Sequence, residues 1–207
     1  MSAMTERGVG VDLVIVGKDI SLKPFELEHI SDRYVRWLND PEVNRFLEVR
    51  FVRQTPETAL AFVRSFDGPI EKYMWGIWAN KHPEMIGTAT LMNIDRHHGT
   101  AVLGLMIGER AWWGGYTAIE AVELIMQAAF QRLGLRRLSG ATYATNYGMN
   151  FIFKRSGFTC EGKSRQACMV SPGVYVDGHV WAILVDEWRA RMQRHDTEHA
   201  GFSNSNP

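Results

Sequence analysis

Two tryptophans and two glycines separate an apolar run from an amphipathic segment in RAWWGGYTAIEA, which extends from Arg110 to Ala121. The run from Thr100 to Ile107 reads as a strand, and apolar residues recur at helical spacing after Gly115. Such a junction leaves several backbone N–H groups unpaired at the positive end of a helix dipole. Because glycine has no Cβ, a bulky anion can approach the main chain closely there. The pattern predicts a phosphate cradle made of backbone. The alternative is a plain glycine-rich turn in which Trp112 and Trp113 only pack.

Two common phosphate-binding motifs are excluded at this junction. A Walker loop ends in Lys followed by Ser or Thr, and the dinucleotide fingerprint has a different glycine spacing, so Gly114 and Gly115 fit neither motif. No acidic side chain lies between Arg110 and Ile119, which keeps the local field favourable for an anion. We therefore expect an anion to bind main-chain N–H groups rather than a lysine.

Strand-like and helical patterns follow one another along the whole chain. One or two strands are expected at residues 13–25, and one strand each at 73–79, 85–93, 100–107, 137–143, 158–170 and 174–185. Helices are expected at residues 26–38, from Pro41, from Pro56, at 115–133 and at 147–156. Short connections between the middle strands suit antiparallel neighbours, and Asp177–His179 is expected to turn between the last two strands. This order predicts an α+β (mixed α/β) fold, a single domain with one central sheet.

The composition limits the class of protein. A chain of 207 residues with 45% hydrophobic residues is long enough for one domain with a sizeable core. The 23 basic and 23 acidic residues cancel, which argues against binding a nucleic acid by phosphate neutralisation. The two cysteines, Cys160 and Cys168, make no disulfide framework, and no signal peptide or membrane span is evident. We expect a cytoplasmic protein with no nucleic-acid or membrane partner. It would comprise a flexible N-terminus (1–10), a domain (11–192) and a disordered, polar C-terminal tail (193–207).

Four blocks of the sequence resemble, in the same order, blocks of the GNAT N-acetyltransferase superfamily. The acetyl-CoA-binding segment of that family is similar to MIGERAWWGGYTAIEAVELIMQAAFQRLGLRRL, and its second signature to YATNYGMNFIFKRSGFTCEGKSRQ. The branch with the ribosomal-protein-alanine acetyltransferases resembles this chain in SLKPFELEHISDRYVRWLNDPEVNRFL and YVDGHVWAILVDEW. The resemblance covers roughly residues 20–190. It implies a twisted mixed sheet that splays after its fourth strand, with acetyl-CoA in the gap.

The resemblance also implies the contacts of acetyl-CoA, which is the co-substrate in this family. The pantetheine arm is implied along the backbone of Leu105, Met106 and Ile107. Asn146 is implied as a catalytic-site residue that hydrogen-bonds this arm near the thioester. The pyrophosphate is implied on consecutive N–H groups, those of Trp113, Gly114, Gly115, Tyr116, Thr117 and Ala118.

The sequence departs from the family pattern where proton transfer is expected. Val102 takes the place of a glutamate on the fourth strand, and Met149 and Phe153 take the places of a serine or tyrosine after the family's asparagine. The glycine loop differs as well, because its second small residue comes one place early, at Gly115, and Tyr116 follows. The usual general base and general acid are therefore missing.

Other side chains can fill these places. Tyr147 lies next to Asn146 and can donate a proton to the thiolate; the alternative is a surface tyrosine at a helix start. Glu48 and Arg50 follow the second short helix, where this branch lines the acceptor pocket. A carboxylate attracts a cationic amine and a guanidinium grips a phosphate, whereas the alternative is a solvated charged loop. The backbone N–H of Ile107 can stabilise a developing oxyanion.

The leading interpretation is an acetyl-CoA-dependent N-acetyltransferase for a primary amine of a small molecule. WLNDPEVNRFLEVRF resembles a block of amino-sugar acetyltransferases. An amino sugar, free or linked to a nucleotide whose phosphate meets Arg50 and Arg53, is thus the first candidate. Acetylation of a protein N-terminus and an acyl-CoA sensor without catalysis stay open as alternatives. No metal is expected, because Asp95, His97 and His98 lack partners at diagnostic spacing. The resemblance implies a homodimer, since the final strand often pairs between subunits in related proteins.

Overall fold

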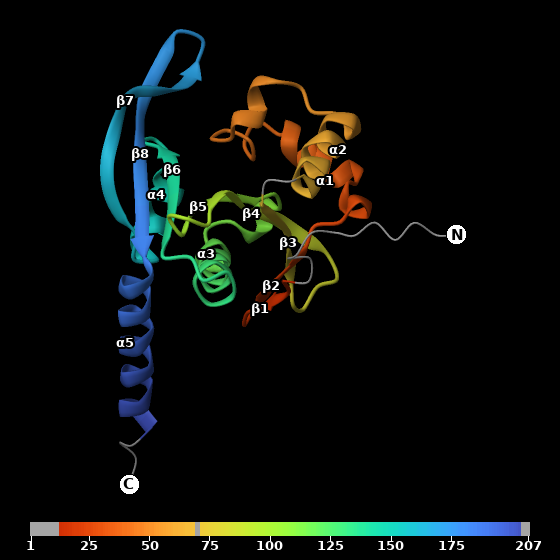
Figure 1. The fold of residues 1–207 in the computed structure, drawn as a ribbon. Coiled ribbons are helices and arrows are strands. Elements are labelled where there is room, and N and C mark those ends of the chain that lie inside the picture. The colour runs from red at the N-terminus through yellow and green to blue at the C-terminus, as the bar shows by residue number, and fades with distance from the viewer. Residues whose placement is uncertain (1–12, 69–70, 204–207) are drawn as a thin grey trace.

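The computed structural model describes residues 13–68 and 71–203, which are arranged around one eight-stranded sheet (Figure 1). The order of strands across the sheet is β1-β2-β3-β4-β5-β6-β8-β7. Their bounds are β1 Ile15–Val16, β2 Ile20–Pro24, β3 Tyr73–Ala79, β4 Met85–Asp95, β5 Thr100–Ile107, β6 Arg137–Tyr143, β7 Thr159–Ser171 and β8 Val174–Leu184. All neighbouring pairs are antiparallel except β5 and β6, which run parallel. The expected mixed α+β fold with one central sheet is confirmed.

Helices lie on both faces of this sheet. Their bounds are α1 Asp32–Asn39, α2 Pro56–Arg64, α3 Thr117–Gln127, α4 Tyr147–Arg155 and α5 Val185–Ser203. Single turns lie at η1 Leu27–His29, η2 Glu48–Phe51, η3 Ser65–Asp67, η4 Arg110–Trp112 and η5 Ala128–Arg132. In Figure 1, α1 and α2 lie above the β3–β5 part of the sheet, α3 lies below it, and α5 leads away from the body.

Two hydrophobic clusters hold these layers together. The larger one packs α3 against the sheet and includes Trp75, Leu103 and Ile125. The smaller one packs α1 and α2 against the opposite face and includes Trp37 and Met106. Full burial of a side chain of this kind contributes about 1.5–3 kcal/mol. Because β5 supplies side chains to both clusters, its position in the middle of the molecule is fixed from both faces.

Near the N-terminus, helix bounds differ from the expectation where a side chain competes with the helix. The helix expected at 26–38 begins only at Asp32, because the hydroxyl of Ser31 caps it by accepting a hydrogen bond from the N–H of Tyr34 at 3.3 Å. The helix expected from Pro41 is instead a set of turns. There Asp40 accepts a hydrogen bond from the N–H of Glu42 at 2.9 Å through its side chain.

The turn between the last two strands was expected at Asp177–His179, and this expectation is wrong. The chain turns at Pro172 and Gly173, and Gly173 has a φ of 77°, which favours glycine. Asp177 lies inside β8. Its carboxylate accepts a hydrogen bond from the N–H of Gln166 at 2.9 Å, where the register of β7 is irregular.

The C-terminal helix α5 continues to Ser203 and so includes much of the expected tail at 193–207. The expected flexible segment at 1–10 lies outside the described residues. Within residues 13–68 and 71–203, no helix is long and apolar enough to cross a membrane.

Candidate active site

The sheet opens between β5 and β6. These strands pair only over Thr100–Val102 of β5 and Arg137–Ser139 of β6. Beyond Val102 they separate, while β5 stays paired with β4 as far as Ile107 and β6 stays paired with β8 as far as Tyr143. One edge of β5 therefore faces a gap instead of a strand. Residues 13–25 were expected to form one or two strands and form β1 and β2. Counted as one, they make β5 the fourth strand, after which the sheet was expected to splay.

The alternation of the backbone decides which groups of β5 face this gap. The carbonyl of Gly99 accepts a hydrogen bond from the N–H of Arg136 at 2.8 Å. The carbonyl of Ala101 accepts one from the hydroxyl of Ser139 at 3.2 Å. The odd-numbered residues thus direct their N–H and C=O groups away from β4. Beyond Val102, backbone N–H and C=O groups therefore point into the gap at Leu103, Leu105 and Ile107.

The expected pantetheine contacts change accordingly. Leu105 and Ile107 present backbone groups to the gap, but Met106 is the register partner of Thr88 and directs its groups toward β4. The carbonyl of Ile107 accepts a hydrogen bond from the indole N–H of Trp113 at 2.8 Å, which leaves its N–H for a ligand. Leu103, which sequence reasoning missed, extends the open edge toward the point where the strands separate.

The loop after β5 has the open geometry expected of a phosphate cradle. Within the part of the chain that the structure describes, the N–H groups from Gly114 to Ile119 have no hydrogen-bond partner. Gly114 has a φ of 73°, and a Cβ added at Gly114 or Gly115 would meet no atom within 4 Å. Trp113 differs from the expectation, because its N–H donates to the carbonyl of Arg110 at 3.0 Å. The cradle therefore begins at Gly114, and these residues fit a pyrophosphate.

Charged side chains beside the cradle are paired with other groups. Arg110 forms ion pairs with Asp40 at 2.7 Å and with Glu42 at 2.6 Å. Its hydrogen bond to Asp40 holds the pKa of that carboxyl below its usual range. Glu120, in the first turn of α3, accepts a hydrogen bond from the N–H of Asp19 at 2.9 Å. The open N–H groups and the dipole of α3 are thus left to attract an anion.

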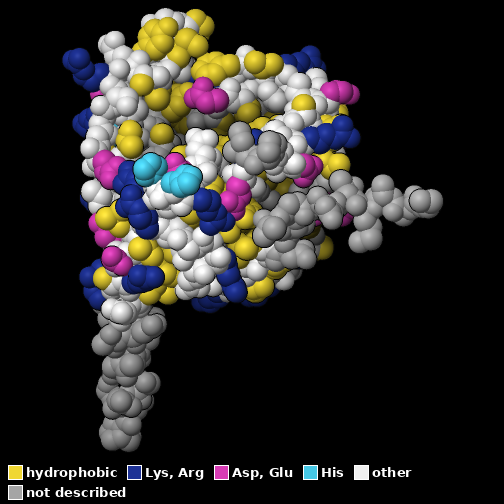
Figure 2. Space-filling model, viewed as in Figure 1, with side chains coloured by type: hydrophobic (Ala, Val, Ile, Leu, Met, Phe, Trp, Pro, Cys, Tyr) yellow, Lys and Arg dark blue, Asp and Glu magenta, His cyan; other side chains and the backbone are white. Residues whose placement is uncertain are grey.

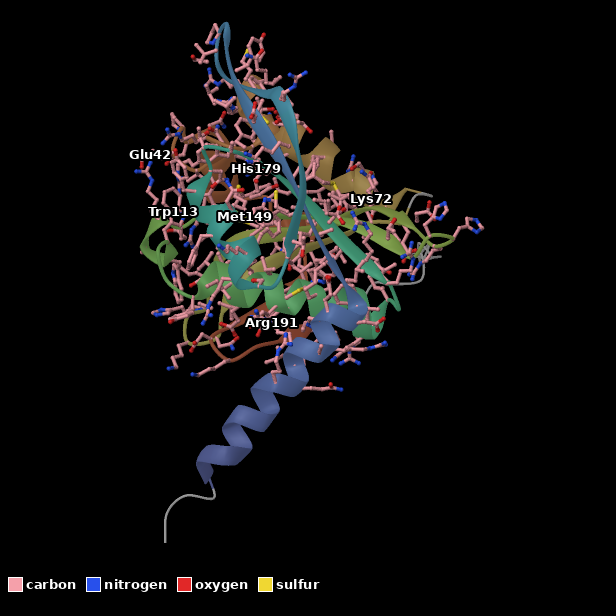
Figure 3. The ribbon with its side chains drawn as sticks, turned by 90° about the vertical axis from the view of Figure 1, so that its left-hand side faces the viewer. Glu42, Lys72, Trp113, Met149, His179 and Arg191 are labelled. Carbon is pink, nitrogen blue, oxygen red and sulfur yellow. The ribbon has the colours of Figure 1, made fainter. Side chains whose placement is uncertain are left out.

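Helix α4 follows β6 along the chain, and Figure 3 labels Met149 in its first turn. Asn146 caps this helix, because its Oδ1 accepts a hydrogen bond from the N–H of Met149 at 3.1 Å. Tyr147 is 78% exposed in the first turn, and its role as a proton donor stays a prediction. Met149 packs on the larger cluster and Phe153 is buried inside it, so neither provides an acidic group.

Tyr143 and Glu48 form a hydrogen-bonded pair on the α1–α2 face of the sheet, opposite to α4. Of the two, only Glu48 was predicted from the sequence. On β6 the side chain of Thr142 faces α4, so that of the next residue, Tyr143, points to the α1–α2 face. Its hydroxyl donates to Oε1 of Glu48 at 3.0 Å. Burial and this hydrogen bond raise the pKa of Tyr143. The side chain of Val102 points to the same face, because it alternates in step with Met106 of the α1–α2 cluster.

Arg50 connects the segment before α2 to the β7–β8 hairpin. Its Nη1 donates to the carbonyl of Val170 at 3.3 Å, and its Nη2 donates to the carbonyl of Met169. The guanidinium lies over the rings of Phe51 and Tyr143, 4.5 and 5.6 Å from their centroids. Arg50 was expected to bind a phosphate. In the structure its guanidinium instead links η2 to β7.

Asn150 fixes the end of β6 to α4 and β8, and no sequence motif marks it. Its Nδ2 donates to three carbonyls, those of Tyr143 at 3.0 Å, Ala144 at 3.3 Å and Asn146 at 2.8 Å. Its Oδ1 lies within hydrogen-bond distance of Thr142 Oγ1 at 2.6 Å, Trp181 Nε1 at 3.0 Å and His179 Nδ1 at 3.1 Å. The expected turn residue His179 is therefore part of this network inside β8.

A strand edge that faces a gap, followed by an open helix N-terminus, offers the unpaired N–H groups that an extended ligand with a phosphate group needs. A family model described as an acetyltransferase (GNAT) domain matches residues 19–159, and the chain belongs to the GNAT acetyltransferase family. The chain is 33% identical over 115 residues to the probable N-acetyltransferase YjcK of Bacillus subtilis (strain 168). That alignment covers 55% of this chain and spans only 62% of the length of YjcK.

Two solved structures illustrate the shared fold. A putative acetyltransferase from T. thermophilus is 26% identical, with a TM-score of 0.72 over 89% of this chain and 96% of that one. The RimL ribosomal-protein acetyltransferase, in complex with coenzyme A, is 18% identical, with a TM-score of 0.72 over 84% of this chain and 99% of that one. At this identity, RimL shows a common fold and nothing finer.

Proposed function

We propose that this acetyltransferase transfers the acetyl group of acetyl-CoA to a primary amine of a small molecule. Acetyl-CoA supplies an activated acyl group as a thioester. The open N–H groups from Gly114 to Ile119 support its pyrophosphate, and the gap-facing edge at Leu103, Leu105 and Ile107 supports its pantetheine arm. Asn146, at the N-terminus of α4, lies at the β6 side of the same gap.

The acceptor would approach from the α1–α2 face of the gap. The opposite face carries α3 and its open N-terminus, where the cofactor phosphates would bind. On the α1–α2 face, the exposed carboxylate of Glu48 supplies a negative charge that attracts an ammonium group. Glu48 therefore keeps the acceptor-binding role expected from the sequence, whereas Arg50 acts on the shape of the pocket.

The Arg50 bridge is the observation that favours a small acceptor over a polypeptide. It joins η2 to the carbonyls of Met169 and Val170, so the two segments that could border an open groove are tied together. Beside the bridge lies a cleft of about 400 Å³, a volume typical of small-molecule sites. Its lining includes Arg45, whose guanidinium can donate to the oxygens of a hydroxylated body. The amides of Asn39 and Asn44, also in the lining, already bond the main chain. An amino sugar is the first acceptor to test, as the sequence resemblance also suggests.

The experiment is CoA thiol release from acetyl-CoA with a panel of amines. The panel contains amino sugars, their nucleotide conjugates, polyamines, aminoglycosides and peptides with free N-termini. We expect turnover with a small amine and none with peptides. Turnover with peptides alone would overturn the proposal in favour of protein N-terminal acetylation. Tight acetyl-CoA binding without turnover on any amine would indicate a sensor.

Arg50→Met tests the bridge itself, with Arg64→Met, an exposed change at the end of α2, as the matched control. Removal of the bridge should lower kcat/KM for the small amine by ~10-fold or more through lost positioning. It should also improve the ratio of peptide to small-amine turnover. An unchanged ratio would show that the bridge does not select the acceptor.

A further inference from the structure

β5 has no titratable side chain, which leaves the acceptor ammonium without a base on that strand. We propose that the carboxylate of Glu48 removes a proton from the acceptor ammonium and that Tyr143 is the positioning residue that holds this carboxylate. The inference rests on the proposed amine acetylation and names the residues that make the amine nucleophilic.

The first support is the position of the pair. Tyr143 is the last residue of β6, on the strand that borders the gap, and its side chain lies on the acceptor face. Its hydroxyl is 3.0 Å from Oε1 of Glu48. Tyr143 is 6% exposed, whereas Glu48 is an exposed residue. A buried donor thus holds one oxygen of a carboxylate that an incoming amine can still reach.

The second support is the rigidity of the donor. The carbonyl of Tyr143 accepts a hydrogen bond from Nδ2 of Asn150 at 3.0 Å, which fixes its backbone. Its ring meets the ring of Phe46 edge-on, with centroids 5.7 Å apart, and lies under the guanidinium of Arg50. Because the tyrosine cannot rotate freely, its hydroxyl selects one orientation of the flexible Glu48 side chain. Oε2 of Glu48 then has no bond to this donor and can accept a proton.

The charged and titratable groups around Glu48 come from three other places. Tyr143 faces it from β6, Cys168 interacts with it from β7, and Arg50 lies on its own turn; Asp177 of β8 acts on Cys168. Burial, followed by the nearby Glu48 charge, raises the pKa of Cys168, so this thiol stays protonated at neutral pH. Burial and the bond to Glu48 also raise the pKa of Tyr143. Neither group competes with the carboxylate as a base.

The proton balance of the reaction follows directly. The ammonium gives one proton to Glu48, and the neutral nitrogen then forms a bond to the acetyl carbon as the carbon–sulfur bond breaks. The second nitrogen proton passes to the departing sulfur through solvent. Glu48 finally releases its proton to water, so free coenzyme A, the amide and one proton are the products.

The test is the pH dependence of kcat/KM for the best amine of the panel in Glu48→Gln and Tyr143→Phe. Without the base, the enzyme depends on amine that is already neutral. At neutral pH, kcat/KM of Glu48→Gln should be ~10²–10⁴-fold lower than that of wild-type enzyme. The loss should shrink ~10-fold per pH unit until the pKa of the amine is reached. A structural role for Glu48 would lower the rate equally at every pH, and that result would overturn the inference.

The positioning role of Tyr143 needs its own readout. Tyr143→Phe alone should lose ~10-fold in kcat, but should cost nothing further in the Glu48→Gln background, because it acts through Glu48. Equal losses in both backgrounds would show that Tyr143 acts independently. Glu57→Gln and Tyr175→Phe, both exposed, are the matched controls and should leave the pH profile unchanged.

A binding measurement separates this inference from the proposed function. By calorimetry without acetyl-CoA, wild-type enzyme should prefer the amine to its neutral hydroxyl analogue, and Glu48→Gln should lose that preference. If wild-type enzyme acetylates the amine but Glu48→Gln keeps both its pH profile and its preference, the inference fails and the function stands. If no amine is acetylated, the proposed function fails first.

Discussion

At the scale of single residues, Asn150 has the most connections around the candidate site. Its amide group donates to carbonyls at the end of β6 and the start of α4, and its oxygen faces Trp181 and His179 of β8. An asparagine can satisfy both sets at once because it carries two donors and an acceptor on one planar group. The site depends on this residue because Asn150 sets the backbone position of Tyr143.

Asn150→Ala should therefore destabilise the protein. It leaves the indole N–H of Trp181, an 8% exposed side chain, with only the longer contact to Thr142 at 3.2 Å. It also removes the side-chain donor of the Ala144 carbonyl, whereas the carbonyls of Tyr143 and Asn146 keep main-chain donors. Loss of partners for buried polar groups costs about 1–3 kcal/mol each, so we expect the free energy of unfolding to fall by about 3 kcal/mol. Urea unfolding measures it. The neighbouring change Phe151→Ala, at a 63% exposed side chain, is the control. Equal urea midpoints for the two variants would contradict a stabilising role of the Asn150 hydrogen bonds.

Local residue chemistry could be predicted from the sequence, and long-range partners could not. Gly114 and Gly115 were identifiable because an open backbone before a helix follows from the residues themselves. The partner of Glu48 was not, since Tyr143 lies 95 positions away and only the fold brings the two together. Arg50 was recognised as important, but its partners are main-chain carbonyls, which carry no sequence signal.

At the scale of elements, the junction of β5 and α3 combines two sources of unpaired N–H groups. β5 loses its neighbour beyond Val102, and α3 begins without a side-chain cap at Tyr116. A side-chain cap would occupy the donors that a phosphate needs, so the missing cap is consistent with anion binding. The cradle is thus a property of two elements and the glycines between them.

Gly115→Asp should abolish anion binding at the junction of β5 and α3 while leaving the fold intact. A Cβ at Gly115 meets open space, and a carboxylate near a helix N-terminus does not destabilise the helix. Repulsion of the pyrophosphate should raise the Kd for acetyl-CoA by ~10-fold or more, with an unchanged or higher Tm. Gly115→Asn has the same size without the charge and should have a much smaller effect. Equal Kd values for both variants would mean that size, not charge, matters there.

Element bounds were predictable where periodicity alone sets them. β3, β5 and β6 have the expected limits, because apolar strands between turn-forming residues leave little choice. Bounds were wrong where a polar side chain binds the backbone. Ser31 delays α1, and Asp40 stabilises a turn where a helix was expected. Asp177 bonds to β7 rather than forming a turn, since the bulge that needs it is not visible in the sequence.

At the scale of the whole molecule, the gap divides the sheet into two parts that share the larger hydrophobic cluster on the α3 face. The short parallel pairing of β5 with β6 joins them at one end, and Arg50 joins them at the other. β8 is paired on both sides over Gly178–Ala182, so the free edge on this side is β7 rather than the last strand. A homodimer, which stays a prediction, would therefore form through β7. Figure 2 shows hydrophobic side chains gathered at the end of the molecule where this hairpin turns, and Val174 and Tyr175 are more than half exposed there.

Stability at alkaline pH should depend on the packing of the α1–α2 layer. Tyr34 is 2% exposed between Phe25 and Trp37, and burial raises its pKa from 10.0 to about 12. The folded state thus binds the hydroxyl proton more tightly than the unfolded state does. This contribution is complete below pH 10.0 and is lost as the pH rises toward about 12. Since one pKa unit corresponds to about 1.4 kcal/mol, the loss is about 2–3 kcal/mol.

Tyr34→Phe should remove that alkaline loss while keeping the aromatic packing. We expect urea midpoints at pH ~8 and pH ~11.5 to lie closer together in Tyr34→Phe than in wild-type protein. Part of the alkaline loss of stability should persist in Tyr34→Phe. Burial and the bond to Glu71 also raise the pKa of Tyr73 to about 12. Tyr175→Phe, at an exposed position, should retain the whole loss. If both variants lose stability as wild-type protein does, the α1–α2 layer must open before Tyr34 ionises, and alkaline unfolding would then start at the acceptor face.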